Sequence, residues 1–344
     1  MKKDINRFLD DVKKLLERHK RSPYGYSRRT IDVGIPRLLD VSTYGTTDAL
    51  NILYTINEFP SDPAERAEWV KAIQATQDEE TGLFVDFTPA STFADDPKPS
   101  ELMHCTAFAT ATLELFDAKP LYRLSAYDKF RTKEGLHKFL DELDWGYPVW
   151  QSSHRGAGLF SAMNIAGEAT PEWNDWFFDW LWNETDEDTG FWRKGRAEEF
   201  LYRNMGSGFH YLFCLEHNKM PLRYPDKVID TCLRLYNEQM MNPTPTHIFG
   251  KKISFVEIDW VYYISRAARQ TTHRGDEVKR AISEFAESYI DYLLSLDLET
   301  HVGADDIHDL FGALCCVADL QTLLPGEIIS DKPLRLVLER RPFI

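Results

Sequence analysis

Apolar positions recur with helical spacing along the whole chain, and sustained strand-like alternation is absent from it. In one kind of segment the apolar residues form a single stripe, as Trp69 and Ile73 do, while charged residues such as Glu65 and Glu68 face away. Pro63 stands where the first turn of such a helix begins, a position that needs no amide hydrogen. The pattern predicts six amphipathic helices, over 3–20, 62–77, 131–143, 171–184, 225–241 and 274–296.

A second kind of segment is small, apolar and nearly free of charge beyond its first turn. The stretches Thr106–Leu115 and Leu310–Ala318 show the type. A helix that is apolar on nearly all sides has to be covered on all sides, and its small residues let neighbouring helices approach closely. We therefore expect inner helices over 41–57, 101–117, 153–167, 204–217, 255–270 and 304–324.

The two kinds of segment alternate strictly, outer then inner, six times. This order predicts an all-α fold, namely a closed α/α toroid of six helical hairpins with twelve helices in an outer and an inner ring. An open solenoid needs polar capping repeats at its ends, and neither terminal hairpin resembles one. Although 344 residues would otherwise suggest two domains, we expect residues 1–344 to form a single toroid domain.

A short internal repeat supports the idea of repeated hairpins. Residues 78–84 read Asp-Glu-Glu-Thr-Gly-Leu-Phe, and residues 186–192 read Asp-Glu-Asp-Thr-Gly-Phe-Trp. Each follows an expected outer helix. The glycine of each repeat can adopt the left-handed conformation that ends a helix, and the aromatic residue after it can then tuck beneath the ring.

Charge and composition narrow the partners. A formal net charge of −15 repels phosphate backbones and anionic lipid, so we expect neither nucleic acid nor membrane as a partner. The first residues lack the apolar stretch of a signal peptide, and no apolar run reaches the roughly 20 residues of a membrane helix. The five cysteines lie in apolar helical contexts, which is typical of reduced thiols and predicts a cytoplasmic protein. A homo-oligomer is compatible with the sequence.

The stretch 69–84, followed by His104-Cys-Thr-Ala-Phe-Ala, resembles the repeats of the terpenoid cyclase and protein prenyltransferase toroids. Its Thr-Gly-Leu-Phe turn is also similar to turns of six-hairpin glycosidases such as the unsaturated glucuronyl hydrolases. The resemblance implies a helical ring around a central cavity. The chain lacks the DxDD motif of class II cyclases, and Val261 stands where the prenyltransferases have a zinc thiolate between Asp259 and His308. We therefore expect no metal and no cofactor.

In a closed helical ring, the starts of the inner helices reach a common funnel, which is the expected ligand site. Polar or aromatic residues stand at all six starts. Aromatic and polar side chains there suit the binding of a small-molecule or oligosaccharide substrate. The substrate-binding candidates are Tyr44, Asp48, His104, Trp150, His154, Arg155, His210, Trp260 and Tyr262.

The catalytic candidates are carboxylates and one histidine. Asp305 and Asp306 stand near His308 at the last inner helix, an arrangement that can raise one carboxyl pKa toward neutrality. Glu257 and Asp259 interrupt an otherwise apolar stretch, where an unpaired charge is costly.

These residues favour a carbohydrate-active enzyme, either a glycoside hydrolase or a related lyase or epimerase. Glycoside hydrolysis uses two carboxyls roughly 5–10 Å apart. Two alternatives stay open at this point: an isoprenoid-type cyclase, transferase or isomerase with a deep aromatic cavity, and a non-catalytic toroid whose cavity is plugged by side chains.

Overall fold

The computed structural model describes residues 2–86, 99–146, 149–195, 201–241 and 249–344. This part of the chain is all-helical, and each of the twelve expected segments overlaps one α-helix, although α4, α6 and α8 begin two to four residues earlier than expected. The helices are α1 (Asn6–His19), α2 (Thr43–Thr55), α3 (Pro63–Gln74), α4 (Pro99–Leu115), α5 (Lys133–Asp141), α6 (Val149–Ala166), α7 (Pro171–Glu184), α8 (Leu201–His217), α9 (Pro225–Asn237), α10 (Val256–Ala268), α11 (Gly275–Ser295) and α12 (Ile307–Leu323).

Extended structure is limited to short pieces in the described residues. Strand β1 (Lys3–Asp4) pairs in parallel with β4 (Ile328–Ile329), and β2 (Lys20–Ser22) pairs with β3 (Gly25–Tyr26) in an antiparallel ladder. Three 3₁₀ helices complete the elements: η1 (Pro36–Leu39), η2 (Ser125–Phe130) and η3 (Val337–Glu339). The β1–β4 pair joins the beginning of the chain to a segment that follows α12.

Burial separates the two kinds of helix as the sequence pattern predicts. Every residue from Glu257 to Ala267 in α10 is buried, and so is every residue from Leu310 to Leu320 in α12. In α11, by contrast, the buried residues recur at helical spacing, from Val278 to Leu293, and form one stripe. A fully covered helix has to lie between neighbours, whereas a striped helix can face water.

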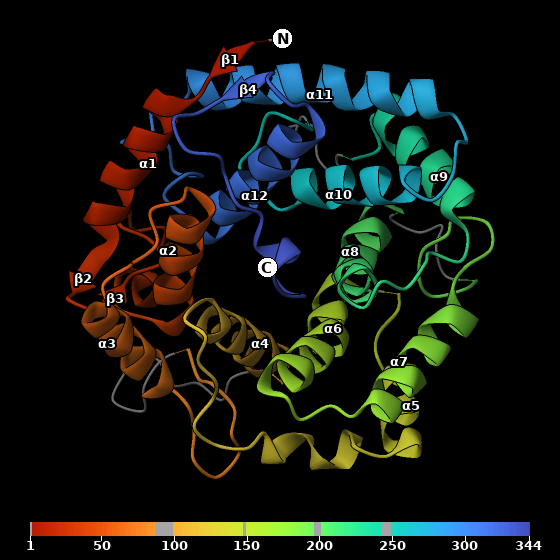
Figure 1. Cartoon of the computed structure of the whole chain (residues 1–344), viewed down its shortest axis with the longest axis horizontal. Helices are drawn as coiled ribbons and strands as arrows, with labels where there is room; N and C mark the ends of the chain where they lie inside the picture. The colour runs from red at the N-terminus through yellow and green to blue at the C-terminus, as the bar shows by residue number, and fades with distance from the viewer. Residues whose placement is uncertain (1, 87–98, 147–148, 196–200, 242–248) are drawn as a thin grey trace.

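The even-numbered helices contact one another in sequence. Helix α2 contacts α4, α4 contacts α6, and the series continues through α8 and α10 to α12, which contacts α2. Figure 1 shows these six helices around the centre and the odd-numbered helices outside them. The arrangement is compatible with a helical toroid.

The two repeats in the sequence have the same conformation. Gly82 and Gly190 both have positive φ, at 73° and 76°. Each closes a turn whose first aspartate accepts hydrogen bonds from the threonine backbone and side chain three residues later. The aromatic residues that follow, Phe84 and Trp192, are buried. Both glycines thus adopt the predicted left-handed conformation, but they close turns that follow the helices and do not end them, because α3 ends at Gln74 and α7 at Glu184.

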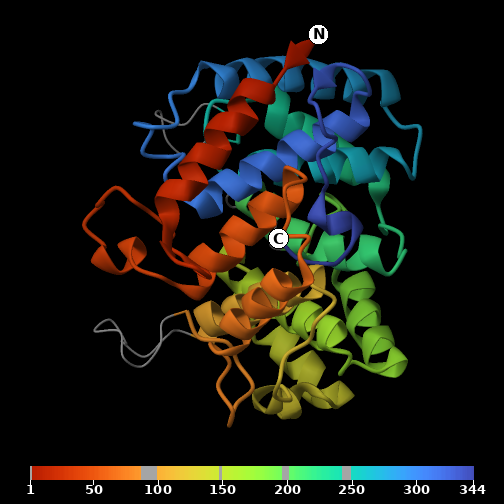
Figure 2. The same cartoon turned by 60° about the vertical axis from the view of Figure 1, so that its left-hand side comes forward.

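The last residues of the chain lie inside the ring of helices. Figures 1 and 2 both place the end marked C among the even-numbered helices, away from the outer surface. Arg341, Phe343 and Ile344 are buried there. Among the described residues, no helix is both long enough and apolar enough to cross a membrane.

Candidate functional site

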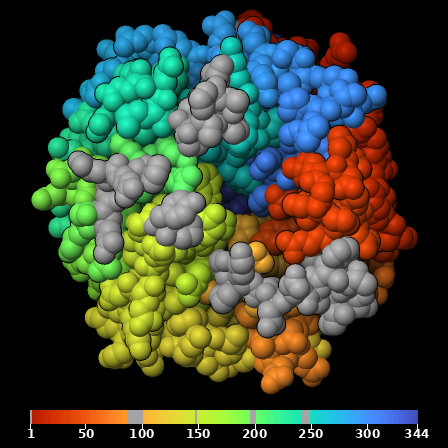
Figure 3. Space-filling view, turned by 180° about the vertical axis from the view of Figure 1, so that it is seen from behind, coloured from red at the N-terminus to blue at the C-terminus, as the bar shows by residue number. Residues whose placement is uncertain are grey.

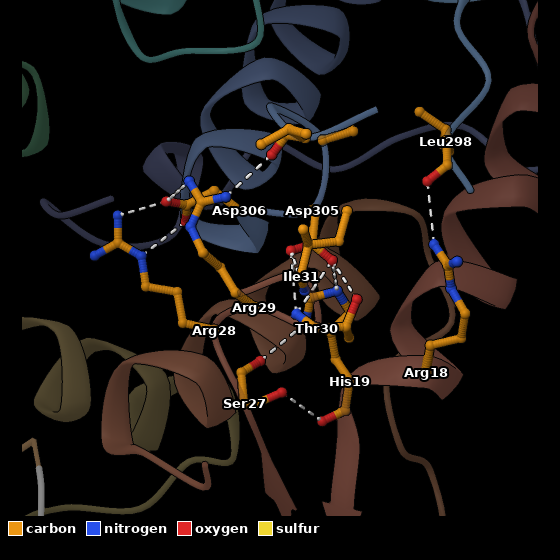
Figure 4. Close-up of polar contacts among 12 residues, drawn as sticks. Arg18, His19, Ser27, Arg28, Arg29, Thr30, Ile31, Leu298, Asp305 and Asp306 are labelled. Atoms are coloured by element: carbon orange, nitrogen blue, oxygen red, sulfur yellow. Dashed lines mark hydrogen bonds and ion pairs between the residues drawn. The ribbon is translucent and has the colours of Figure 1, made fainter. Parts of the chain in front are cut away.

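The predicted catalytic residue Asp306 lies where the first hairpin meets α12. Its carboxylate accepts hydrogen bonds from Arg28 Nε at 2.7 Å and Nη2 at 3.0 Å, and from Arg29 Nη2 at 2.7 Å. It also caps α12 by accepting from the His308 amide. Burial alone would raise the pKa of Asp306, but Arg28 and Arg29 hold it below its ordinary value. Asp306 is therefore an ionised carboxylate whose oxygens are already engaged (Figure 4).

Asp305 is engaged in the same joint. Its oxygens accept hydrogen bonds from the backbone amides of Thr30 and Ile31 and from the Thr30 hydroxyl. The His19 Nε2 atom lies 3.6 Å from Asp305 Oδ1. Figure 4 shows the two side chains beside each other. We call this joint, formed by residues 27–31 with Asp305 and Asp306, the seam. Both aspartates connect the first hairpin to the last inner helix.

Glu257 and Asp259 lie in α10, and no hydrogen bond or ion pair between described residues links them to the seam. Glu257 accepts from Ser254 Oγ at 2.6 Å and from the Gly250 amide, and burial raises its pKa to about 7. Both carboxylate oxygens of Asp259 are buried without a hydrogen-bond partner. Burial and the nearby Glu257 raise the pKa of Asp259 well above its ordinary value, which favours its neutral form.

Three predicted binding residues face other parts of the molecule. Trp260 packs on Tyr236, Phe249 and Phe285, and its indole donates to the Cys232 carbonyl, so it faces the outer helices. The Arg155 guanidinium lies over the ring of Phe139 in α5, 5.3 Å from its centre. Tyr262 is buried with the Arg266 guanidinium over its ring at 3.8 Å.

The remaining candidates come together. The ring of His104 in α4 lies 4.3 Å from that of His154 in α6, which in turn lies 4.9 Å from His210 in α8. His308 at the start of α12 lies 6.0 Å from His104. Tyr44 in α2 and Phe255, just before α10, contact His308 at 5.8 and 4.8 Å. All six inner helices thus contribute to one group, which we call the histidine collar: Tyr44, His104, His154, His210, Phe255 and His308.

Three of the collar histidines are held in the same way. The Nδ1 atom of His308 is 2.9 Å from Asp48 Oδ1, that of His210 is 2.8 Å from Ser153 Oγ, and that of His104 is 2.5 Å from the Tyr44 hydroxyl. In the described part of the chain, the Nε2 atom of each has no hydrogen-bond partner. A partner on one ring nitrogen fixes the tautomer and orientation of an imidazole and leaves the other nitrogen available.

The partners also set which nitrogen carries the proton. An ionised Asp48 can only accept, so Nδ1 of His308 donates to it, and in a neutral imidazole with that tautomer Nε2 carries the lone pair. The Ser153 hydroxyl donates to the Trp150 carbonyl at 2.5 Å, so it accepts from Nδ1 of His210. His210 therefore also offers a lone pair at Nε2. The ring of Trp150 lies against His210, at 6.2 Å, and flanks the collar.

Burial dominates the electrostatics of the collar. It lowers the pKa of His154 to about 3, and it lowers the pKa of His104 and His210 well below the ordinary value. These imidazoles are neutral at pH 7. Burial also raises the pKa of Asp48, against the opposing effects of His308 and Arg28. His104, His154 and His210 are consequently polar side chains without a charge at neutral pH.

Figure 3 shows a hollow at the centre of one face of the molecule, and its visible floor has the blue of the C-terminal part of the chain. His154 and His308 keep part of their surface exposed, whereas His104 and His210 are 5% exposed. In the residues that the structure describes, no group of three or more His, Cys, Asp or Glu side chains is arranged to hold a metal ion.

The chain was compared with known proteins. No protein family, curated protein or solved structure matches it. The collar and the seam are therefore the features of the molecule that bear on its function.

Sequence reasoning missed several residues of these two regions. Arg28 anchors the predicted residue Asp306, and Phe255 completes the collar. Ser153, which anchors His210, is one of the polar residues that the sequence places at the inner-helix starts, one residue before His154. Arg28 precedes its partner Asp306 by 278 positions and has no local pattern that would link the two.

Proposed function

We propose that the chain is a closed α/α toroid of six hairpins, a single domain, whose collar is the acid–base site of a carbohydrate-active enzyme. The observation that carries the proposal is the set of collar imidazoles with Nδ1 held and Nε2 open. Such groups accept and donate protons, and an adjacent carboxylate stabilises the imidazolium that forms. In this proposal His308, oriented by Asp48, is the principal base.

The chemistry of the collar supports a sugar as the ligand. A neutral imidazole has one donor and one acceptor nitrogen, which matches the hydroxyl groups of a polyol. Trp150 and Phe255 supply flat apolar rings at the same site. A small-molecule or oligosaccharide substrate remains the proposed partner.

The seam changes the reaction that we favour within this class. Asp305 and Asp306 have their oxygens engaged by the 27–31 segment, so they are poor candidates for the two carboxyls of a glycosidase. Histidine bases suit proton abstraction from a carbon beside a carbonyl or carboxylate, which is the chemistry of the epimerases and lyases. We therefore favour an epimerase or lyase over a hydrolase.

The proposal is tested by isotope exchange. The protein is incubated in D₂O with neutral monosaccharides, disaccharides, uronic oligosaccharides and prenyl diphosphates, and NMR records deuterium at carbon and new products. We expect exchange or elimination with a sugar, lost in His308→Gln. The matched control is His137→Gln, because the Nε2 atom of His137 contacts the Trp176 carbonyl, away from the collar. The proposal fails if no sugar is altered or if the two variants behave alike.

A non-catalytic sugar-binding toroid is the second candidate. Its support is the burial of Phe343 and Ile344 inside the ring, because a filled lumen is what a toroid without chemistry predicts. This candidate predicts that a sugar raises the melting temperature without exchange. The isoprenoid alternative requires a long aromatic cavity. The buried Phe343 occupies the space beneath the collar, so it favours a shallow site over a long cavity.

A further inference from the structure

The space between the inner helices is layered beneath the collar. On α4, α8 and α12, a phenylalanine follows the collar histidine by three or four residues: Phe108 after His104, Phe213 after His210 and Phe311 after His308. One helical turn advances about 5.4 Å along the axis, so these rings lie one level below the imidazoles. Phe108 is in contact with both Phe311 and His308, at 5.9 and 5.6 Å. The collar thus stands directly on an aromatic layer.

Phe343 occupies this layer without belonging to an inner helix. Its ring centre lies 5.2 Å from that of His104, 6.0 Å from Phe108 and 5.8 Å from Phe213. The residue is completely buried. A single side chain therefore bridges α4 and α8 immediately beneath the collar, at the level where the lumen would otherwise continue.

Polar contacts one level lower hold the segment that carries Phe343. The buried Arg341 guanidinium donates to the Phe343 carbonyl and to Asn51 Oδ1 of α2. The Ser161 hydroxyl of α6 donates to the Pro342 carbonyl. These contacts reach the segment from two different inner helices and specify its position.

Arg341 is a buried, charged side chain. Burial lowers the pKa of Arg341 to about 10, so the group is still cationic at pH 7. No carboxylate among the described residues forms an ion pair with it. A buried cation without a counterion is costly, and its two hydrogen bonds connect residues 341–343 to Asn51 of α2.

We propose that Phe343 is the floor of the collar site and its specificity-determining residue, so that a ligand enters from the collar side and only its terminal unit reaches the imidazoles. The sugar nature of that ligand rests on the proposed function, but the floor does not. A toroid closed in this way accepts the end of an oligosaccharide and excludes a chain threaded through the ring.

The experiment compares wild-type protein with Phe343→Ala. An apolar cavity of about 150 Å³ stays dry and binds benzene or xenon. We expect benzene to raise the melting temperature of Phe343→Ala and to shift the NMR signal of the His104 imidazole, with neither effect in wild type. The matched control is Phe285→Ala, which removes a buried ring of α11 that packs on Phe249 and Tyr289, outside the lumen. Benzene there should leave the His104 signal unchanged.

The proposal that Phe343 is the floor is wrong if benzene does not bind Phe343→Ala, or if it binds without shifting the NMR signal of the His104 imidazole. Should Phe343→Ala fail to fold, Phe343→Leu with xenon as the probe decides in the same way. The specificity role is measured with sugars: the disaccharide-to-monosaccharide affinity ratio should rise about tenfold in Phe343→Ala. An unchanged ratio overturns that role. If no sugar binds either protein, the proposed function fails, and the benzene result still decides the floor.

Discussion

The seam and the histidine collar are both buried clusters of titratable groups, yet their hydrogen bonding differs. At the seam, Asp306 accepts from two arginines and Asp305 from two backbone amides and a hydroxyl. At the collar, each held imidazole has one nitrogen engaged and one open. Burial and charge are common to both regions. A side chain can act on a ligand only if one of its polar atoms is not already hydrogen-bonded within the protein.

The largest expected effect is on the seam. Asp306→Ala leaves Arg28 and Arg29 without their shared partner, and breaking a buried ion pair typically costs about 3–5 kcal/mol. Urea denaturation measures the loss. The control is Asp291→Asn, which removes the exposed pair between Lys3 and Asp291 and should cost less than about 1 kcal/mol. Equal costs for the two variants would contradict the assignment of Asp306 to holding the ring.

The opposite result is expected for the carboxylate at the collar. Asp48 is fully buried, and its Oδ2 atom has no hydrogen-bond partner. Asp48→Asn removes a desolvated charge, so stability should be unchanged or rise by about 1 kcal/mol. Proton exchange into a sugar should fall roughly 100-fold or more, since the amide no longer stabilises the imidazolium. Denaturation and exchange rates of the same preparation give both numbers, and a loss of stability would place Asp48 with the seam residues.

The two regions should respond to acid over different ranges. Burial holds the folded pKa values of His104, His154 and His210 below the unfolded value of 6.5, to about 3 for His154, so the unfolded state binds more protons between these limits. Their contribution to stability is therefore present above pH 6.5 and declines as pH falls, by about 1.4 kcal/mol per histidine and pH unit. The Asp306 pKa is lowered, so its contribution persists until pH falls below that of an unfolded carboxyl.

Denaturation between pH 7 and pH 4, together with NMR titration of the imidazoles, separates these two contributions. His154→Gln should reduce the change in the free energy of unfolding by about 1.4 kcal/mol per pH unit, which corresponds to one proton. A His154 signal that titrates near pH 6.5 would show that the collar is wetter than its burial indicates.

The smallest expected effect concerns the bonds that orient the collar. Ser153→Ala frees Nδ1 of His210 while leaving its ring packing in place. We expect a loss of stability of about 1 kcal/mol and a decrease of about tenfold in exchange rate. Ser152→Ala, at the neighbouring position where the hydroxyl accepts from the Asp144 amide, is the control for the helix start. Equal exchange rates in the two variants would remove His210 from the proposed machinery.

The sequence predicted the helices well because complete burial leaves a local signature. The unbroken small and apolar run from Leu310 to Ala318 can belong only to a covered helix. It predicted part of the candidate site for a related reason: His104, His154 and His308 stand in the first two turns of apolar helices, although His210 lies in the middle of α8. The orientation of Trp260 was not predictable, because α10 is buried on every side and no polar face indicates the direction of the lumen.

The parts of the candidate site that the sequence did not predict depend on residues that are distant in the chain. The engagement of Asp305 and Asp306 depends on residues 28–31, which carry no matching pattern. The position of Phe343 could not be foreseen either, since Arg-Arg-Pro-Phe-Ile has no periodicity that assigns it to a layer. Local patterns report how much of an element is covered, and they do not report what covers it.

The seam also has a consequence for the order in which the molecule assembles. The Arg28–Asp306 contact closes a loop of 278 residues, and joining the ends of a flexible loop of that length costs about 5 kcal/mol of entropy. Each hairpin that packs on its predecessor shortens the remaining gap. The seam is therefore best formed last, after nearly all of the chain has been synthesised, and until then α2 exposes the apolar surface that α12 will cover. During synthesis the uncovered apolar surface of α2 is therefore a place where the nascent protein can aggregate.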